Sequence, residues 1–216
     1  MKLAQCWDDG VTDDIRLIEI LRRHGARASF NLNAATHKAV REGGSKRGDR
    51  LVQRLARGEL VSVYEGFLVA NHTLTHPKLT QIAPEEARRE IREGRDALEQ
   101  IFGYDVKGFA YPYGDFNEEV AQMVREAGHC YARTCQTVQG ALPIETPMVQ
   151  PTHCHFLAVD FWDKFEAVCA ADGVFYFWGH SYELDTEDHW SAFEEKIRRL
   201  SAAGEWVDLP EIFSDG

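Results

Sequence analysis

Short apolar segments alternate with longer amphipathic segments along most of this chain of 216 residues. In the longer segments, apolar side chains recur every three or four residues, which is typical of helices that pack one face against a sheet. The short segments are expected as strands at residues 2–7, 28–32, 60–70, 106–111, 130–134 and 174–178. About six or seven alternations, without an internal repeat or a linker, predict an α/β fold. We expect a single domain over residues 1–216, built as a distorted (β/α) barrel with about seven mainly parallel strands.

Helices are expected at residues 12–25, 51–58, 84–103, 117–128, 160–171 and 190–200. The helix at 84–103 carries clear end signals, because Pro84 stands at its start, Glu85 and Glu86 follow in the first turn, and Gly103 follows the last apolar residue. Residues 136–151 show no such periodicity and are expected to be irregular.

Residues 34–50 differ from the rest of the chain, because they combine cations and glycines with almost no large apolar side chain. The cations are Lys38, Arg41, Lys46, Arg47 and Arg50, and the glycines are Gly43, Gly44 and Gly48. A segment of this composition is expected as a mobile basic loop insertion at the mouth of the fold. It is either a solvated loop without a further role or a flap that gates access of substrate.

Chemically reactive side chains follow two of the expected strands. Asp8 and Asp9 stand at the end of the first one, where parallel α/β proteins place their functional groups. His72 and His76 stand four residues apart, a spacing that puts both imidazoles on one face of a helical turn. Two imidazoles and one carboxylate make a metal site, and the second carboxylate is left to act as a base. The alternatives are a turn with a helix cap for the two acids and surface or capping roles for the histidines.

Four short blocks then occur in series: Trp-Asp-Asp-Gly at residues 7–10, His-Thr-Leu-Thr-His at 72–76, Phe-Ala-Tyr-Pro-Tyr-Gly at 109–114 and Trp-Gly-His at 178–180. Together they resemble the polysaccharide deacetylase family, also called the NodB-homology domain or carbohydrate esterase family four. The resemblance runs from about residue 3 to residue 180. It implies a distorted (β/α) barrel that removes an acetyl group, usually from an N-acetylated sugar, with the help of a metal.

The resemblance also implies a metal-ligand set. Asp9, His72 and His76 would bind one divalent ion, with zinc as the first expectation and cobalt, nickel or iron as alternatives. Amide hydrolysis needs a nucleophile at neutral pH, and a bound cation lowers the pKa of water to about 7.

Three further roles follow from the same resemblance. Asp8 would be the general base that takes a proton from the attacking water. Tyr113 would offer its backbone N–H to the oxyanion, and His180 would be the general acid for the leaving amine. The chemistry agrees, because an oxyanion needs a preorganised donor and an amine leaves poorly unless it is protonated.

The chain departs from the family pattern in two places. The third block commonly carries an arginine that pairs with the base aspartate, whereas this chain has Ala110 and Tyr111 there. We expect Arg133, at the end of the next strand, to fill that place, the alternative being a surface arginine. The aspartate that usually tunes the acid histidine is not recognisable, and Asp160 and Asp163 are the candidates.

A second group of metal-binding residue types occurs at His153-Cys154-His155. It is expected to line the cleft or a loop without a metal, and a second metal site is the alternative. The acidic residues 183–188 are expected as a solvated helix entry or as part of the cleft rim.

We therefore predict a metal-dependent hydrolase that removes an acetyl or small acyl group from a small N-acetylated saccharide or a related amide. A non-haem iron oxygenase is one alternative, because that class also uses two histidines and a carboxylate. A metal-binding domain without catalysis is the other.

The composition limits the classes of partner and the cellular compartment that are expected. The net charge of −11 disfavours nucleic acid and anionic membranes and favours a neutral or cationic substrate. No apolar run reaches the length of a membrane span. The five cysteines contain no Cys-x-x-Cys motif and indicate reduced thiols. With no export signal recognised, a cytoplasmic location is expected, and a homo-oligomer is left open.

Overall fold

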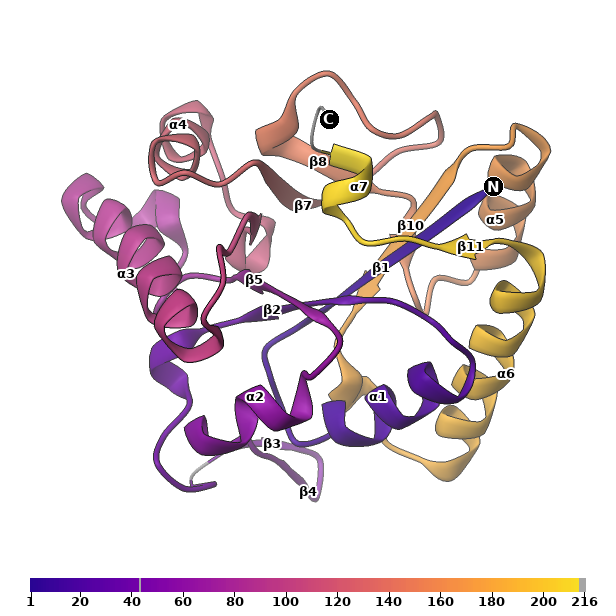
Figure 1. The fold of residues 1–216 in the computed structure, drawn as a ribbon, viewed down its shortest axis with the longest axis horizontal. Coiled ribbons are helices and arrows are strands. Elements are labelled where there is room, and N and C mark those ends of the chain that lie inside the picture. The colour runs from indigo at the N-terminus through magenta and orange to yellow at the C-terminus, as the bar shows by residue number, and fades with distance from the viewer. Residues whose placement is uncertain (43, 214–216) are drawn as a thin grey trace.

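A curved sheet with helices on its outside forms the body of the computed structural model, which describes residues 1–42 and 44–213 (Figure 1). Its strands are β1 (Lys2–Asp8), β2 (Ser29–Leu32), β5 (Leu68–Asn71), β6 (Gly108–Ala110), β7 (Tyr131–Thr137), β8 (Gln150–Thr152), β9 (Cys154–His155), β10 (Val174–Gly179) and β11 (Glu205–Trp206). A separate hairpin consists of β3 (Ser45–Arg47) and β4 (Arg50–Val52). The helices are α1 (Asp14–Arg23), α2 (Leu60–Val63), α3 (Pro84–Phe102), α4 (Glu118–Glu126), α5 (Phe161–Ala170), α6 (Glu187–Ala203) and α7 (Pro210–Phe213).

Eight strands of the sheet are hydrogen-bonded in the order β8-β7-β6-β5-β2-β1-β10-β9, and β11 pairs with β1 beside this path. Every pairing in this sheet is parallel. The two edge strands, β8 and β9, are separated in the chain by His153 alone. The sheet therefore curls until its edges nearly meet, which confirms the distorted (β/α) barrel.

Strand register brings the carboxyl ends of four neighbouring strands to one rim of the barrel. Trp7 in β1 stands opposite Gly179 in β10, and Asp8 stands opposite Asn31 in β2. Between β2 and β5, Leu32 stands opposite Asn71, the last residue of β5. The residues that follow β1, β5 and β10 are consequently neighbours in space although they are far apart in the chain.

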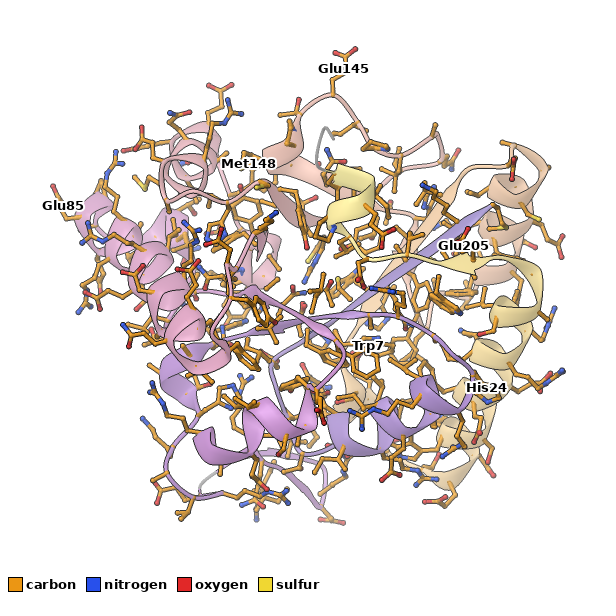
Figure 2. All side chains as sticks on the ribbon, viewed as in Figure 1. Trp7, His24, Glu85, Glu145, Met148 and Glu205 are labelled. Atoms are coloured by element: carbon orange, nitrogen blue, oxygen red, sulfur yellow. The ribbon has the colours of Figure 1, made fainter. Side chains whose placement is uncertain are left out.

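An aromatic core lies between this sheet and its helices. Trp7 is fully buried, with its ring centroid 5.0 Å from that of Phe156 and 5.3 Å from that of Phe193 in α6. Figure 2 shows Trp7 in the interior, while Glu85 and Glu145 point outward at the periphery. Burying a side chain of this kind contributes about 2–3 kcal/mol, so Trp7 anchors the strand that ends at Asp8.

Three expected segments differ in the structure: residues 51–58, residues 60–70 and the basic insertion at 34–50, which contains the strand β3. The helix expected at residues 51–58 was wrong: Arg50–Val52 is a strand, and a 3-10 turn follows at Arg57–Glu59. The hairpin partner β3 satisfies the backbone of β4, with Gly48 at φ 59° in the turn between them. Residues 60–70 are a short helix, α2, before the strand β5, because Leu60 packs inward. Within the basic insertion, Gly43 lies outside the described residues.

All five cysteines are free thiols. Among the described residues, none of the helices combines the length and the apolar character needed to span a bilayer.

Candidate metal and catalytic site

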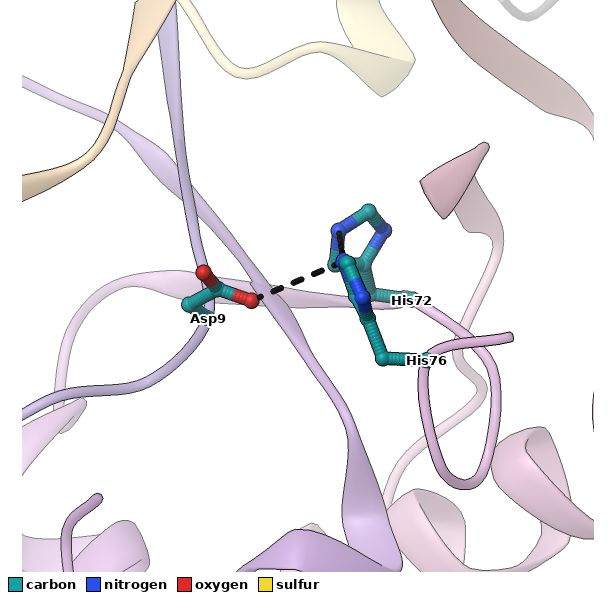
Figure 3. Close-up of side chains that lie close together, drawn as sticks. All are labelled: Asp9, His72 and His76. Carbon is teal, nitrogen blue, oxygen red and sulfur yellow. Dashed lines mark hydrogen bonds and ion pairs between the residues drawn. The ribbon is translucent and has the colours of Figure 1, made fainter. Parts of the chain in front are cut away.

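Asp9, His72 and His76 come together at the rim where β1 and β5 end (Figure 3). Their candidate ligand atoms all lie within 4.8 Å of one another. The two Nε2 atoms of the histidines are 3.2 Å apart, and Nε2 of His76 is 3.7 Å from Oδ1 of Asp9. The three residues therefore present two nitrogens and one oxygen to a common point.

The state of these donors fits a divalent metal. Nδ1 of His72 donates to the carbonyl of Ala110 at 2.7 Å, which leaves the lone pair of its Nε2 facing the other ligands. Burial lowers the pKa of His72 to about 4 and also lowers the pKa of His76, so both rings are neutral at pH 7. Oδ1 of Asp9 is buried without a hydrogen-bond partner in the described part of the chain. Neutral imidazoles and a carboxylate oxygen are the donor set that Zn²⁺ takes.

The loop that carries both histidines is not the helical turn that their spacing suggested. Thr73 and His76 have φ values of 69° and 72°, outside the right-handed helical region. Helix α3 holds the loop instead, because Glu90 accepts hydrogen bonds from the backbone N–H of Thr75 at 2.8 Å and from its hydroxyl at 2.7 Å. The backbone N–H of Leu74 donates to the carbonyl of Glu90 at 3.0 Å.

Backbone strain is concentrated at this rim. In the described part of the chain, five residues other than glycine have a positive φ, and four of them lie here: Asp9, Thr73, His76 and Tyr113. Such conformations cost on the order of 1–3 kcal/mol each and persist where function constrains the chain. The strain therefore singles out the rim as the candidate functional site.

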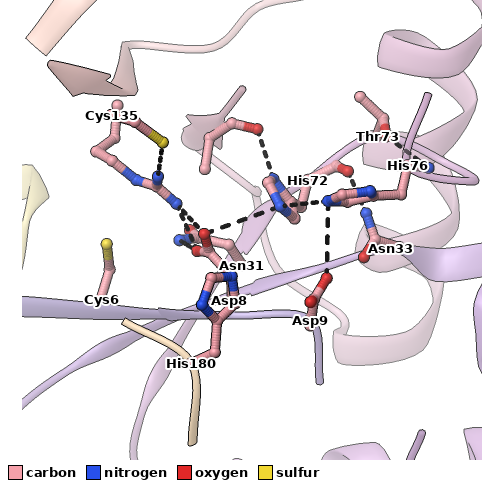
Figure 4. Close-up of polar contacts among 12 residues, drawn as sticks. Cys6, Asp8, Asp9, Asn31, Asn33, His72, Thr73, His76, Cys135 and His180 are labelled. Atoms are coloured by element: carbon pink, nitrogen blue, oxygen red, sulfur yellow. Dashed lines mark hydrogen bonds and ion pairs between the residues drawn. The ribbon is translucent and has the colours of Figure 1, made fainter. Parts of the chain in front are cut away.

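Asp8 lies beside the ligand set and is held as a carboxylate. It accepts hydrogen bonds from Nδ2 of Asn31 at 2.6 Å and from Nη2 of Arg133 at 2.5 Å to each oxygen (Figure 4). Asp8 and Arg133 are 2% and 1% exposed, so this is a buried ion pair. Burial alone would raise the pKa of Asp8, but the charges of Arg133 and of nearby histidines outweigh it and hold the pKa well below its usual range. Oδ2 of Asp8 is 3.9 Å from Nε2 of His72.

His180 follows β10 and is held in place by Glu183. This role of Glu183 was not identified from the sequence. Oε2 of Glu183 accepts from the backbone N–H of His180 at 3.1 Å and from its Nδ1 at 3.3 Å. The same oxygen lies 2.9 Å from Nε2 of His155. Burial, the largest influence, lowers the pKa of His180, but the hydrogen bond to Glu183 and the charges of Asp8 and Asp9 together raise it above its ordinary value.

The two sequence candidates for this role, Asp160 and Asp163, were wrong. Asp160 pairs with Lys164 at 3.1 Å, and neither aspartate lines the cavity at the rim. The signal for Glu183 was its position three residues after His180, the spacing at which a glutamate reaches back to the backbone N–H at the start of a helical turn.

The two histidines in the neighbouring group at residues 153–155 have different roles. Nδ1 of His153 accepts from the backbone N–H of Tyr176 at 3.1 Å, and its Nε2 donates to the carbonyl of Gly140 at 3.2 Å. Both nitrogens of His153 are thus used by the fold. His155 instead joins His180 and Glu183, and the three form a second group of potential ligands.

A cavity of about 610 Å³ opens over these residues. Tyr113, at φ 59° in a 3-10 turn, lines it with a ring that is 63% exposed and 4.6 Å from that of His76, centroid to centroid. Arg54 also lines it and places Nη1 3.1 Å from Oδ1 of Asp9, a contact that the sequence did not indicate.

Comparisons with known proteins show what the chain is similar to. The family model described as "Polysaccharide deacetylase" matches residues 2–132. The chain is 25% identical over 127 residues to a peptidoglycan-N-acetylglucosamine deacetylase of Bacillus cereus, covering 58% of this chain and 41% of that protein. It is 32% identical over 124 residues to a chitooligosaccharide deacetylase of Rhizobium leguminosarum bv. trifolii, covering 56% of this chain and 51% of that protein. The chain thus spans about half, or less, of the length of these relatives.

A solved structure shares the fold over nearly the whole chain. The family 4 carbohydrate esterase from Streptomyces lividans in complex with acetate superposes with a TM-score of 0.58 at 18% identity. The match covers 94% of this chain and 86% of that one.

Proposed function

Because the chain belongs to the polysaccharide deacetylase family, we propose that it is a metal-dependent hydrolase that removes the acetyl group from a small N-acetylated saccharide. One observation carries the proposal. Asp9, His72 and His76 converge on one point, and a second carboxylate, Asp8, stands beside them without being needed as a ligand.

One divalent ion, zinc in the first instance, held by Asp9, His72 and His76 would act as a Lewis acid and lower the pKa of a water molecule. Asp8 is ionised and takes the proton of the attacking water. Arg133 orients this carboxylate through its contacts to both oxygens.

The remaining steps fall to residues on the other strand ends. The backbone N–H of Tyr113 donates to the oxyanion that forms when water adds to the acetyl carbonyl. His180 then gives its proton to the nitrogen of the leaving amine. Glu183 holds the ring of His180 through Nδ1 and raises its pKa, which favours the protonated ring that a general acid needs.

An iron oxygenase would use the same two histidines and one carboxylate. It would leave the buried pair of Asp8 and Arg133 without a role, whereas amide hydrolysis uses that carboxylate directly. The pair therefore favours the hydrolase.

Acetate release from a panel of N-acetylated mono- and oligosaccharides, with and without a chelator, tests the proposal. We expect release that the chelator abolishes and added metal restores. Asp8→Asn should lower kcat by on the order of 10²–10⁴, the loss expected for a general base. Asp96→Asn, an exposed aspartate of α3, is the matched control and should retain activity. No acetate from any member of the panel, or equal activity in Asp8→Asn, would contradict the proposal.

A further inference from the structure

The cavity over the site carries an arginine that the proposed reaction does not use. Arg47, at the end of β3, lines the cavity, and its guanidinium carbon lies 4.1 Å from the ring centroid of Tyr182. Among the described residues, the structure gives this guanidinium no carboxylate partner. Its side chain is exposed, so its N–H donors are available to a ligand.

The hairpin that carries Arg47 is fixed against the rim of the barrel. Nη1 of Arg50 donates to the carbonyl of Tyr182 at 3.1 Å, and Nη2 of Arg50 pairs with Asp13. Val52 packs with Val11 and Tyr182 in a small apolar cluster. These contacts hold the hairpin, and with it Arg47, at the rim of the cavity.

Arg47 and Tyr182 stand where three hollows meet. Both line the cavity of about 610 Å³ over the metal ligands, a neighbouring one of about 670 Å³ and a smaller one of about 270 Å³. A saccharide that has its acetamido group at Asp9 and extends toward Leu157 would pass both side chains. The arginine is therefore placed to contact a second sugar or a substituent of the first.

The charged residues that line this cavity do not share the acidic excess of the whole chain. Among the described residues, the carboxylates that line it are Asp8 and Asp9, and each is already beside a guanidinium, that of Arg133 and that of Arg54 respectively. Arg47 is left as an uncompensated cation, in a chain whose net charge is −11.

Acids in the adjacent hollow do not cancel this cation. Glu183 is occupied by two histidines, and Asp185 pairs with His189 at 2.7 Å. Asp49, in the hairpin turn, lines the adjacent hollow but not the cavity over the metal ligands, and no ion pair joins it to Arg47 within the described part of the chain.

We propose that Arg47, stacked on Tyr182, is a specificity residue that binds a carboxylate carried by the saccharide substrate. A guanidinium presents two parallel N–H donors that match the two oxygens of a carboxylate, and a planar aromatic partner keeps it in place. This inference rests on the proposed deacetylase function and narrows it to acidic N-acetylated saccharides. It replaces the expectation of a neutral or cationic substrate, which was drawn from the net charge alone.

Two substrates that differ only in charge test the proposal. One is an N-acetylated disaccharide that bears a carboxylate, and the other is the same disaccharide with that carboxylate converted to its primary amide. We expect kcat/KM to be about tenfold higher for the acid than for the amide, through KM, because Arg47 contacts the substrate away from the reacting atoms. Arg47→Gln should bring this ratio close to one, and Arg47→Lys should retain part of it.

Lys46→Gln is the matched control, because Lys46 is exposed, adjacent in the same strand and outside the cavity, and its loss changes the net charge equally. It should leave the ratio unchanged. A wild-type ratio of one, or an unchanged ratio in Arg47→Gln, would overturn the role of Arg47.

The failure of this proposal can be told apart from that of the deacetylase function. If the neutral amide is deacetylated as well as the acid, only the specificity fails. If neither is deacetylated, the deacetylase function fails, and calorimetric binding of the two disaccharides still decides the role of Arg47. Tighter binding of the acid by the wild type than by Arg47→Gln supports the role, and equal binding refutes it.

Discussion

Glu183 and His180 form a pair in which the carboxylate would act on the proposed reaction through the ring. The single oxygen Oε2 of Glu183 receives both the backbone N–H and Nδ1 of His180, together with a contact from His155. The hydrogen bonds from His155 and His180 outweigh burial and lower the pKa of Glu183 to about 2, so it is ionised throughout the working range of pH. An anion at Nδ1 stabilises the imidazolium form of His180.

Glu183→Gln should therefore shift the pH dependence of the enzyme. The pKa of His180 is raised in the folded protein, and the acid is lost as pH rises through that raised value. Without the anion the pKa falls, so the alkaline limb of kcat/KM should move to lower pH while the acidic limb stays. Asp163→Asn removes an exposed carboxylate elsewhere on the surface and should leave the profile unchanged. An alkaline limb that stays in place in Glu183→Gln would show that the pairing does not tune the acid.

Arg133 is a second residue that would act on the reaction through a neighbouring side chain, that of Asp8. It is buried against Asp8 and also lies over the ring of Trp178, with its guanidinium carbon 4.8 Å from the centroid. Removing one partner of a buried ion pair leaves the other charge uncompensated, which costs about 3–5 kcal/mol.

Arg133→Ala should lower the free energy of unfolding by about that amount and raise the pKa of Asp8. The acidic limb of the activity profile should then move to higher pH, because the base must be ionised to accept a proton. Urea unfolding and a pH–rate profile measure the two effects. Arg133→Lys keeps the charge but not the fork geometry, and should lie between the wild type and Arg133→Ala. Full activity with an unchanged profile in Arg133→Ala would contradict the assigned role.

At the scale of the element, helix α3 positions the loop that carries both histidines. A Cβ on Gly94 would stand 2.8 Å from the carbonyl carbon of Thr73 and 2.9 Å from the backbone nitrogen of Leu74. Both are backbone atoms, so the loop and the helix would have to separate. The helix thus approaches the loop closely enough that only glycine fits at this position.

Gly94→Ala is expected to lower both stability and metal affinity. Within a helix, alanine is ordinarily more favourable than glycine by up to about 1 kcal/mol, so a loss would report the clash alone. We expect a loss of about 1–3 kcal/mol in urea unfolding, together with weaker metal binding in a titration. Gly58→Ala, where a new Cβ meets nothing within 4 Å, is the control and should be near neutral in both measurements. A stabilised Gly94→Ala with unchanged metal affinity would mean that the loop is not held in this way.

For the molecule as a whole, the sequence predicted the barrel because its main strands lie in apolar runs and its long amphipathic helices leave a periodic signal. β8 and β9 were missed because Gln150–Thr152 and Cys154–His155 are short and do not lie in an apolar run. The hairpin of β3 and β4 was missed because β3 is polar and exposed, and because the apolar Leu51 and Val52 of β4 were assigned to a helix.

The sequence could predict those site residues that lie at the ends of expected strands. Asp8, Asp9 and His72 follow from that rule together with the family blocks. Arg133 was expected at a strand end, but it lies within β7 and still reaches Asp8. The left-handed backbone at His76 could not be read from a spacing of four, which a helical turn also produces. Arg54 contacts Asp9 through an irregular connection, whose path leaves no periodic trace in the sequence.

The proposed reaction depends on one metal ion held by three side chains. Metal content per chain, determined by elemental analysis after equilibrium dialysis against zinc, tests this directly in the wild type, in His76→Ala and in the exposed-histidine control His189→Ala. We predict one ion per chain in the wild type and in His189→Ala, and a large loss of the ion in His76→Ala together with loss of acetate release. Undiminished metal content in His76→Ala, or a wild type that releases acetate without any metal, would contradict the account.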